Sequence, residues 1–362
     1  MASNVFNVAV VGYGLSAKVF HIPFINRTSQ FKLHSIVQRT PKQGDSAPED
    51  YPDLKHYRDI KDLLADSEVD VVVITTPPNF HFEMTKAVLE SGKHVLTEKP
   101  FVPTASEANE LAAIAKKHQR LICVYQNRRW DSDFLILKHL IAQGTIGRIV
   151  EFNTHFDRYR ADAPTNWKGN LDIAGGGSVL YDLGTHLIDQ VYTLFGLPQY
   201  VHGRLLSQRE GRIDLTTPDS LSIELTYPNA MLVHARVSVL SAETSQTRYW
   251  VRGSKGSFHK QELDTQEGQL RTGMTPEDPK FGEENPDNYR LTVVGDDGKI
   301  QDHPIPRLVP ETYQAFYDKF GQAVESGKEE DVPVKAIEAR DVLRVIEAVM
   351  ESAKTGKDVI LS

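Results

Sequence analysis

A lysine and a histidine are the side chains of this sequence best suited to proton transfer. Lys99 lies in Glu98-Lys99-Pro100, directly after the short apolar run 94–96. A lysine at such a strand end can polarise a hydroxyl or a carbonyl oxygen. His186 follows Asp182 by four residues. That spacing predicts that both lie on one helical face, where a carboxylate can orient the imidazole for proton exchange near neutral pH. These three residues are the candidate catalytic set.

Each of these patterns also has a plainer interpretation. A single lysine is common on protein surfaces, and Asp182 with His186 equally fits a capped helix whose polar groups are satisfied in the core. The same pair could supply two zinc ligands, but no obvious third ligand accompanies it. We therefore predict no metal site, and the spacing alone leaves the catalytic and the structural interpretation open.

A glycine-rich segment points to a nucleotide. Gly12-Tyr13-Gly14-Leu15-Ser16-Ala17 follows the β-branched run 6–11 and precedes a helical pattern. In that context G-x-G-x-x-G/A lets backbone amides approach a pyrophosphate at a helix N-terminus. We expect dinucleotide binding, with Gly12, Gly14, Leu15 and Ser16 at the cofactor.

The end of the second predicted strand indicates which dinucleotide binds. An NAD-type fold places Asp or Glu there, on the ribose 2′-hydroxyl. This sequence has the neutral Gln38, followed by Arg39 and Thr40 and then Lys42. The cationic and hydroxyl side chains can hold a 2′-phosphate by charge-assisted hydrogen bonds, so we expect NADP, with NAD as the weaker alternative. A solvated loop charge is the plainer interpretation of Arg39.

Two further strand ends carry candidate cofactor contacts. Thr75-Thr76-Pro77-Pro78-Asn79-Phe80-His81 follows the apolar run 71–74. Prolines at the carboxyl end of a parallel strand direct the chain over the crevice where such folds bind ligands. His81 could donate to a ligand or equally cap the helix that it opens. The residues expected at the cofactor here and at the next strand are Thr75, Thr76, Pro77, Asn79, His81, Glu98 and Lys99.

These motifs require a sheet to position them, and the first third of the sequence predicts one. Short strand-like runs alternate with helical patterns, which indicates a parallel sheet covered on both faces. Thr104 and Glu107 form the sequence pattern of a capping box at the start of one helix. The strands are expected at 6–11, 33–37, 69–74, 94–96 and 121–124, and the helices at 60–65, 82–89 and 105–117. We predict a doubly wound Rossmann domain over residues 1–127.

Beyond residue 128 the pattern becomes that of half-buried strands. Apolar and polar residues alternate in 149–159, 221–225 and 233–239, and the last two predict an antiparallel hairpin. We predict a second α/β domain, 128–362, with a large, mostly antiparallel open sheet. One face of that sheet must meet helices or a second subunit, so a homodimer or homotetramer through it is expected.

Two later segments complete the second domain. An amphipathic helix is predicted over 334–353, and it could pack back on the first domain. Residues 262–290 are rich in Glu, Asp, Gly and Pro. An exposed loop is the plain interpretation, and a lid or a subunit-contact arm is the functional one.

Composition excludes several classes of protein. The 362 residues are 40% hydrophobic, and no stretch approaches the length of a membrane span. The net charge of −8 lacks the basic footprint of a nucleic-acid or membrane-surface binder. Cys123 is the one cysteine, which fits a reducing compartment, and the first residues do not resemble a signal peptide. We expect a cytoplasmic protein.

The order of the motifs resembles a known family. A strand with G-x-G, a T-P-x-x-x-H loop, E-K-P and D-x-G-x-H-x-x-D occur in the order typical of the glucose-fructose oxidoreductase and inositol dehydrogenase family (Gfo/Idh/MocA). The resemblance covers nearly the whole chain. It implies that Lys99 and His186 are catalytic and that Asp182 is the accompanying acid. Because all three are present, it favours an enzyme over a sensor that binds dinucleotide and sugar without turnover.

Further segments are similar to the bacterial NADP-dependent scyllo-inositol dehydrogenases of that family. They are residues 12–16 with 19–23, 156–160, 166–168 and 264–267. Ala17 replaces the usual glycine, which the fingerprint tolerates. The resemblance implies hydride transfer between NADP(H) and a secondary alcohol or ketone of a cyclitol or sugar. Arg158, Tyr159 and Trp167 would then line the substrate pocket with Asp182 and His186, although Trp167 fits the core equally well.

Overall fold

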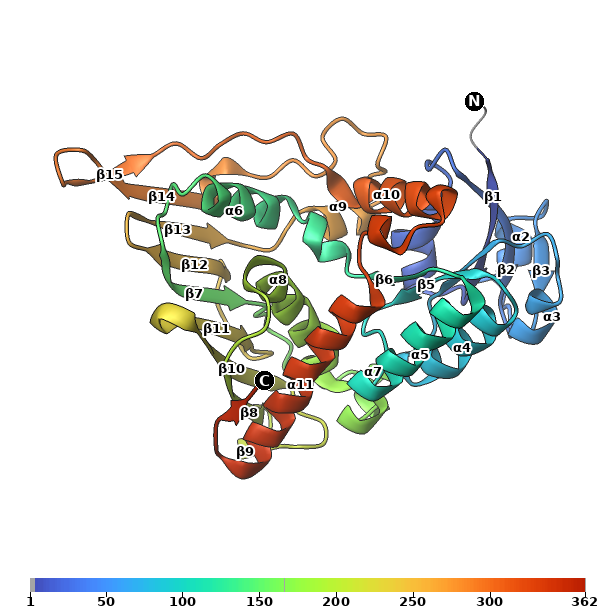
Figure 1. Cartoon of the computed structure of the whole chain (residues 1–362), viewed down its shortest axis with the longest axis horizontal. Coiled ribbons are helices and arrows are strands. Elements are labelled where there is room, and N and C mark those ends of the chain that lie inside the picture. The colour runs from blue at the N-terminus through green and yellow to red at the C-terminus, as the bar shows by residue number, and fades with distance from the viewer. Residues whose placement is uncertain (1–3, 166, 362) are drawn as a thin grey trace. The chain divides into compact units, whose positions relative to one another are not determined.

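The computed structural model describes residues 4–165 and 167–361 (Figure 1). The chain forms two compact units. The first contains residues up to 127 together with 269–281 and 311–340, and the second contains the remainder. The sequence analysis placed a single cut at residue 127, whereas these units are discontinuous. The limits of the domains themselves stay a prediction.

The first unit is built on a six-stranded sheet in which every neighbouring pair is parallel. The strand order is β3-β2-β1-β4-β5-β6, the doubly wound arrangement predicted from the sequence. The strands are β1 (Phe6–Val11), β2 (Phe31–Val37), β3 (Lys55–Tyr57), β4 (Val71–Ile74), β5 (His94–Glu98) and β6 (Ile122–Tyr125). All four residues of β4 are buried, as expected for a strand covered on both faces.

The helices of the first unit follow the predicted alternation. They are α1 (Ile22–Ile25), α2 (Ala47–Asp50), α3 (Ile60–Leu64), α4 (His81–Glu90), α5 (Ala105–His118) and α10 (Thr312–Ser326). The predicted capping box is confirmed at the start of α5, where Thr104 and Glu107 exchange hydrogen bonds. Helix α10 belongs to this unit because Phe316 and Tyr317 pack against Tyr125, with ring centroids 4.9 and 6.0 Å apart.

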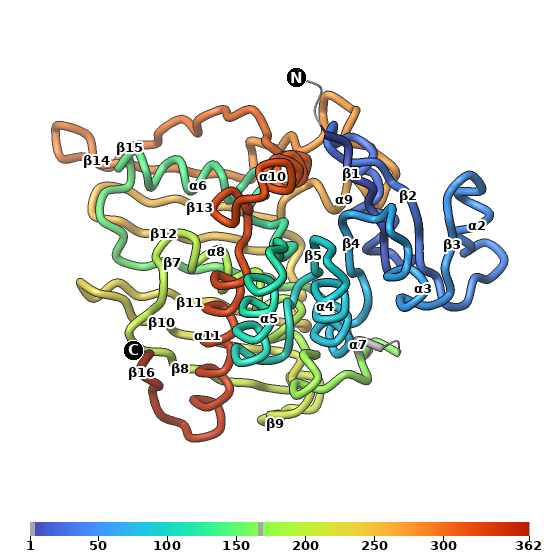
Figure 2. The backbone as a smooth tube through the Cα atoms, turned by 45° about the vertical axis from the view of Figure 1, so that its right-hand side comes forward, coloured from blue at the N-terminus to red at the C-terminus, as the bar shows by residue number. Residues whose placement is uncertain are grey.

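The second unit is built on a ten-stranded sheet, ordered β15-β14-β13-β12-β7-β11-β10-β8-β16, with β9 paired to β8 (Figure 2). Every pair is antiparallel except β7 with β11. The strands are β7 (Ile149–His155), β8 (Tyr200–Ser207), β9 (Arg212–Ile213), β10 (Ser220–Tyr227), β11 (Met231–Val237), β12 (Thr247–Gly253), β13 (Gly256–Gln261), β14 (Tyr289–Val294), β15 (Ile300–His303) and β16 (Val359–Ile360). The predicted large, mostly antiparallel sheet is confirmed.

Helices cover one face of this sheet. They are α6 (Ser132–Ala142), α8 (Thr185–Phe195) and the part of α11 (Ala336–Thr355) that belongs to this unit. The short helices are α7 (Trp167–Asn170) and α9 (Gln266–Arg271). Phe195 of α8 packs against Phe152 of β7, and Ser352 of α11 accepts a hydrogen bond from Gly203 N–H of β8. The opposite face carries exposed side chains, among them Tyr200 and Trp250.

Among the described residues, no helix combines the length and apolarity needed to cross a bilayer.

Candidate active site

The glycine turn of the first unit leaves no room for a side chain at its first position. Gly12 has φ +99°, and a Cβ there would lie 2.6 Å from Thr75 Oγ1. The Thr75 hydroxyl donates to the carbonyl of Val11, 3.0 Å away. The sequence predicted that Gly12 and Thr75 face the cofactor, and the fold brings them together at the carboxyl ends of β1 and β4. A bare backbone at this edge fits close approach by a dinucleotide.

The helix expected after the glycines begins as a π-helical turn, Ala17–His21. Ile22 N–H donates to the carbonyl of Ala17, five residues earlier. Pro23 has no N–H to continue the usual ladder, which is the physical reason for the irregular start. The turn buries His21 completely and directs its ring toward Glu98.

The carboxylate of Glu98 is held by side chains of this turn. One oxygen accepts from Ser16 Oγ and lies 3.0 Å from His21 Nε2, and His21 Nδ1 lies 2.6 Å from the hydroxyl of Tyr317. The other oxygen accepts from the backbone N–H of Lys99 at 2.9 Å. Burial raises the pKa of Glu98, but the hydrogen bonds from His21 and Ser16 and the charge of Lys99 outweigh that effect and hold it below its usual value. The Glu98 carboxylate therefore holds the backbone at Lys99, and its contact with the cofactor stays a prediction.

His81 opens α4 and lies beside backbone carbonyls, and its contact with the cofactor stays a prediction. Its ring is buried. Nε2 lies 2.8 Å from the carbonyl of Thr76, and Nδ1 lies 2.9 Å from that of Pro100. Burial lowers the pKa of His81 and disfavours its charged form. The histidine ties the loop after β4 to the loop after β5, which carries Lys99.

The remaining residues expected at the cofactor lie on exposed or half-exposed turns of the first unit. Asn79 and Leu15 are exposed, and Thr76 and Pro77 are half-buried. These positions leave their side chains accessible at the carboxyl ends of β1 and β4, although no contact with a ligand is part of the structure.

Gln38 has a role in the fold that sequence reasoning missed. Its amide nitrogen donates to the carbonyl of Asp45 at 2.8 Å, and its oxygen accepts from Ala47 N–H at 2.7 Å. Both ends of the side chain therefore hold the loop that follows β2. Arg39 and Thr40 lie on that loop and are exposed, so they are the side chains available to a 2′-phosphate.

In the second unit the helix that carries the candidate acid and base is interrupted. Asp182 lies in a π-helical turn, Leu180–Gly184, and His186 lies in the first turn of α8. The predicted helix across both residues is confirmed, with a π-helical turn in its first part, and the shared face of Asp182 and His186 stays a prediction. His186 is buried, and its ring stacks on Phe156 with centroids 6.4 Å apart and planes 24° apart.

Two polar residues later in α8 fix the helix that carries His186. Asp189 accepts two hydrogen bonds from Arg129, at 2.9 and 2.8 Å. Gln190 donates to the carbonyl of Arg128 at 2.7 Å and accepts from Arg248 and Tyr249. The last aspartate of D-x-G-x-H-x-x-D is thus a structural ion-pair partner, and α8 is anchored one turn beyond its histidine.

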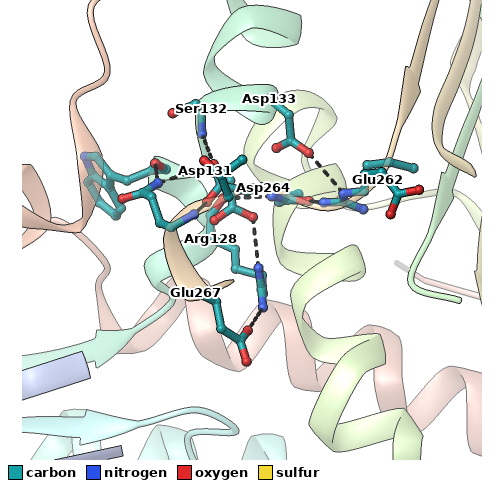
Figure 3. Close-up of polar contacts among 12 residues, drawn as sticks. Arg128, Asp131, Ser132, Asp133, Glu262, Asp264 and Glu267 are labelled. Carbon is teal, nitrogen blue, oxygen red and sulfur yellow. Dashed lines mark hydrogen bonds and ion pairs between the residues drawn. The ribbon is translucent and has the colours of Figure 1, made fainter. Parts of the chain in front are cut away.

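Charged side chains of the second unit form a partly buried network around Arg128 (Figure 3). Arg128 pairs with Glu267 at 2.5 Å and with Asp131 at 3.3 Å. Asp264 accepts from the backbone N–H of Ser132 at 2.7 Å. Burial, and next the charges of Asp131 and other nearby acids, raise the pKa of Asp264 well above its usual value. Arg128 also lies 5.0 Å from the ring centroid of Phe156. Because the Phe156 ring stacks on His186, this contact links the network to His186.

The plain interpretation of 262–290 as an exposed loop holds for most of residues 271–280, but this network anchors the two ends of the segment. Asp264 and Gln266 are buried, and α9 lies within the segment. Gln266 donates to the carbonyl of Trp130 at 2.9 Å, and Glu284 pairs with the fully buried Lys260 at 2.9 Å. Polar residues of the segment bind partners that are distant in the sequence. Composition alone could not predict these contacts. Its roles as a lid or as a subunit-contact arm stay predictions.

The residues expected to line the substrate pocket differ in exposure. Arg158 is half-buried, with its guanidinium 5.7 Å from the Phe156 ring centroid. Tyr159 is 62% exposed, so its side chain is open to solvent in this chain. Trp167 begins α7, but its side chain and all of Asn166 lie outside the described part of the structure. Of the predicted pocket residues, Arg158 and His186 thus lie against one ring, that of Phe156, which was not predicted.

Comparison with known proteins agrees with this architecture. Residues 6–126 match the model of the oxidoreductase family's NAD-binding Rossmann fold, and residues 138–361 match that of its C-terminal alpha/beta domain. The chain belongs to the Gfo/Idh/MocA oxidoreductase family. The resemblance inferred from the motifs is confirmed, and the chain is a member of an NAD-binding oxidoreductase family.

Several Gfo/Idh/MocA members and related structures are similar over their full length. The scyllo-inositol 2-dehydrogenase (NADP(+)) IolW of Bacillus subtilis is 34% identical over 99% of this chain and 96% of its own. An uncharacterised oxidoreductase of Schizosaccharomyces pombe is 38% identical over 98% of both chains. The solved structure of an oxidoreductase from Bacillus cereus is 28% identical, with a TM-score of 0.86 over 99% of both chains.

Proposed function

We propose that this protein is an NADP-dependent dehydrogenase that interconverts a secondary alcohol and a ketone of a cyclitol or sugar. The observation that carries the proposal is the combination of Lys99, Asp182 and His186 in a chain of this oxidoreductase family. Each of the three lies on an element fixed by its own unit: Lys99 beside Glu98, and Asp182 with His186 at the start of α8.

Bound NADP(H) supplies the hydride acceptor or donor of the reaction. His186 accepts the proton of the substrate hydroxyl during oxidation and returns it during reduction. Lys99 donates a hydrogen bond to the same oxygen and stabilises the negative charge that develops there, a role worth about 2.7 to 4 kcal/mol for a positioned donor. Asp182 orients the imidazole or binds a neighbouring hydroxyl.

The preference for NADP is supported by the loop after β2. No carboxylate occupies the position that would bind the ribose 2′-hydroxyl, and Gln38 holds the loop on which Arg39 and Thr40 are exposed. A 2′-phosphate would receive charge-assisted hydrogen bonds from Arg39 that NAD lacks. The similarity to IolW, a scyllo-inositol 2-dehydrogenase (NADP(+)), supports both this cofactor and a polyol substrate.

The proposal extends to assembly and location. The exposed side chains on one face of the large sheet support a homodimer or homotetramer formed through that face. Cys123 is the one cysteine of the sequence and is buried, which supports a reducing compartment such as the cytoplasm.

A spectrophotometric panel tests the proposal. The purified protein is incubated with NADP⁺ or NAD⁺ and a series of cyclitols, sugars and polyols, and reduced nicotinamide is followed by its absorbance. The expected result is turnover with at least one polyol or sugar and higher efficiency with NADP⁺. Tight cofactor binding without turnover of any compound, in either direction, would favour a regulatory sensor instead.

A further inference from the structure

We propose that Arg158 is a specificity residue that binds an oxyanion of the substrate, a carboxylate or a phosphate. This inference rests on the proposed function. It narrows the substrate class from polyols and sugars in general to those that carry an acidic group.

The backbone holds Arg158 in place from both sides. Its N–H donates to the carbonyl of Ser238 at 2.9 Å, and its carbonyl accepts from Ser241 N–H at 3.1 Å. The guanidinium lies over the ring of Phe156, 5.7 Å from the centroid. A side chain fixed in this way by its backbone and by a ring loses little further freedom when it binds a ligand.

Within the described part of the chain, Arg158 has no hydrogen-bonded or ion-paired partner for its guanidinium. Nε is buried without an acceptor, while the residue as a whole is half-buried. The adjacent carboxylate, Asp157, is directed elsewhere, because it accepts from Ser238 N–H at 2.7 Å and contacts His155 at 3.0 Å. Burial, and next the charge of Arg160, lower the pKa of Arg158. The charges of Asp182 and Glu267 oppose this decrease. The guanidinium is therefore partly desolvated, with no hydrogen-bonded carboxylate among the described residues.

The other described arginines of the second unit that are buried or half-buried differ from Arg158 in this respect, because each has an acidic partner. Arg128 is the clearest contrast: it lies over the same Phe156 ring but is paired with Glu267 and Asp131 (Figure 3). The remaining pairs are Arg129 with Asp189, Arg209 with Asp219, Arg248 with Asp133, and Arg344 with Asp341. A desolvated charge without a partner is costly in a folded protein. Arg158 is consequently suited to a partner that arrives from solution.

The position of Arg158 makes that partner part of the substrate. The Phe156 ring contacts both the Arg158 guanidinium and the ring of His186, and Asp182 is close enough to raise the pKa of Arg158. A ligand whose hydroxyl reaches His186 is thus close to the guanidinium of Arg158. A guanidinium presents parallel N–H groups, which match a carboxylate or a phosphate that accepts two hydrogen bonds side by side.

The test compares acidic and neutral substrates with wild type and two variants at this position. D-glucuronate and D-glucose 6-phosphate are each compared with D-glucose, and inositol 1-phosphate with scyllo-inositol. Wild type should prefer at least one acidic compound by about tenfold or more in kcat/KM, as charge-assisted hydrogen bonds provide. Arg158→Gln should lower that kcat/KM by about 10- to 100-fold, mainly through KM, and should lower the kcat/KM of the matched neutral compound by a clearly smaller factor. Arg158→Lys should retain part of the preference, because lysine keeps the positive charge but lacks the two parallel N–H donors of a guanidinium.

Arg148→Gln is the matched control. Arg148 directly precedes β7, whereas Arg158 follows that strand, and Arg148 is exposed. Its replacement by glutamine changes the net charge by the same amount as Arg158→Gln. This variant should keep the kinetics of wild type. The ligand-free Arg158→Gln protein should unfold at the same temperature as wild type or above it, because it loses a desolvated charge that has no partner. A clear decrease in its unfolding temperature relative to Arg148→Gln would assign Arg158 a packing role and overturn the proposal.

Calorimetric binding separates this inference from the proposed function. D-glucuronate, D-glucose 6-phosphate and inorganic phosphate are titrated into wild type and Arg158→Gln in the presence of NADP⁺. Binding that depends on Arg158 without any turnover would contradict the dehydrogenase proposal and retain the anion site. Turnover of neutral polyols with no preference for an acid, or equal losses for acidic and neutral substrates in Arg158→Gln, would overturn the anion site alone. Preference for the carboxylate or for the phosphate identifies which of the two the site accepts.

Discussion

The two units position their candidate residues in different ways. In the first, Gly12, Thr75 and Lys99 follow parallel strands, and a parallel sheet brings the carboxyl ends of its strands to one edge. In the second, Asp182 and His186 lie where a π-helical turn meets α8, while Arg158 follows a strand of a mixed sheet. The topology alone therefore places the first set, whereas irregular local structure places the second.

The polar contacts around the two sets also differ. Glu98 is held by Ser16 and His21, and Gln38 uses both ends of its amide on its own loop. Arg158 has no such partner among the described residues. In the proposed function, the first unit holds the nucleotide and the second selects the substrate.

Loss of either proton-handling residue should have the largest effect, and it tests whether both units contribute to the chemistry. Lys99→Ala and His186→Ala should each bind NADP nearly as wild type does and lose about 10²-fold or more in kcat, the scale of positioned acid-base and electrostatic groups. Lys117→Ala, an exposed lysine of α5, is the control and should retain full activity. A loss below about threefold in either variant, with chemistry shown to limit the rate, would remove that residue from the catalytic set.

Cofactor choice should depend on the first unit alone. Arg39→Ala should lower the ratio of NADP to NAD efficiency about tenfold or more, since a hydrogen bond to a charged group contributes roughly 1.5 to 3 kcal/mol. KM for the polyol should stay the same. Steady-state kinetics with both cofactors measure the ratio, and Lys61→Ala, an exposed lysine of α3, serves as the control. An unchanged ratio in Arg39→Ala would refute this assignment.

The first unit should become less stable in mild acid. Burial, and next the charge of Arg120, lower the pKa of His94 to about 4, and its Nδ1 accepts a hydrogen bond from Leu121 N–H at 3.1 Å. Because the pKa in the unfolded chain is about 6.5, His94 contributes stability above that pH and loses it as the pH falls toward 4.

Replacement by asparagine isolates this effect. His94→Asn keeps an acceptor near the Nδ1 position and does not titrate. Between pH 7.5 and 5, the free energy of unfolding of wild type should fall by about 1 to 2 kcal/mol more than that of the variant, as measured by urea titration. Equal pH dependence of the two proteins would show that His94 is not the group responsible.

Sequence patterns predicted the first unit better than the second for a physical reason. Strand-helix alternation and the Thr104 capping box are local signals, and they were confirmed. Strand β3 was missed because Lys55–Tyr57 is too short to show a period. The partners of Glu98 and Gln266 could not be predicted, since His21 is 77 residues and Trp130 is 136 residues away along the chain. The open guanidinium of Arg158 is likewise a property of the packed structure, because the sequence places Asp157 directly beside it.

Isotope transfer tests the central claim most directly, because it detects hydride transfer even when turnover is slow. The protein is mixed with a stoichiometric amount of NADP⁺ and a polyol that carries deuterium on its carbinol carbons, and the recovered NADPH is examined by mass spectrometry. We predict one deuterium on the nicotinamide with wild type, and little or none within the same time with His186→Ala. Calorimetric binding of both NADP⁺ and the polyol to wild type, with no deuterium in the cofactor, would contradict the account and leave a binding protein of the same fold.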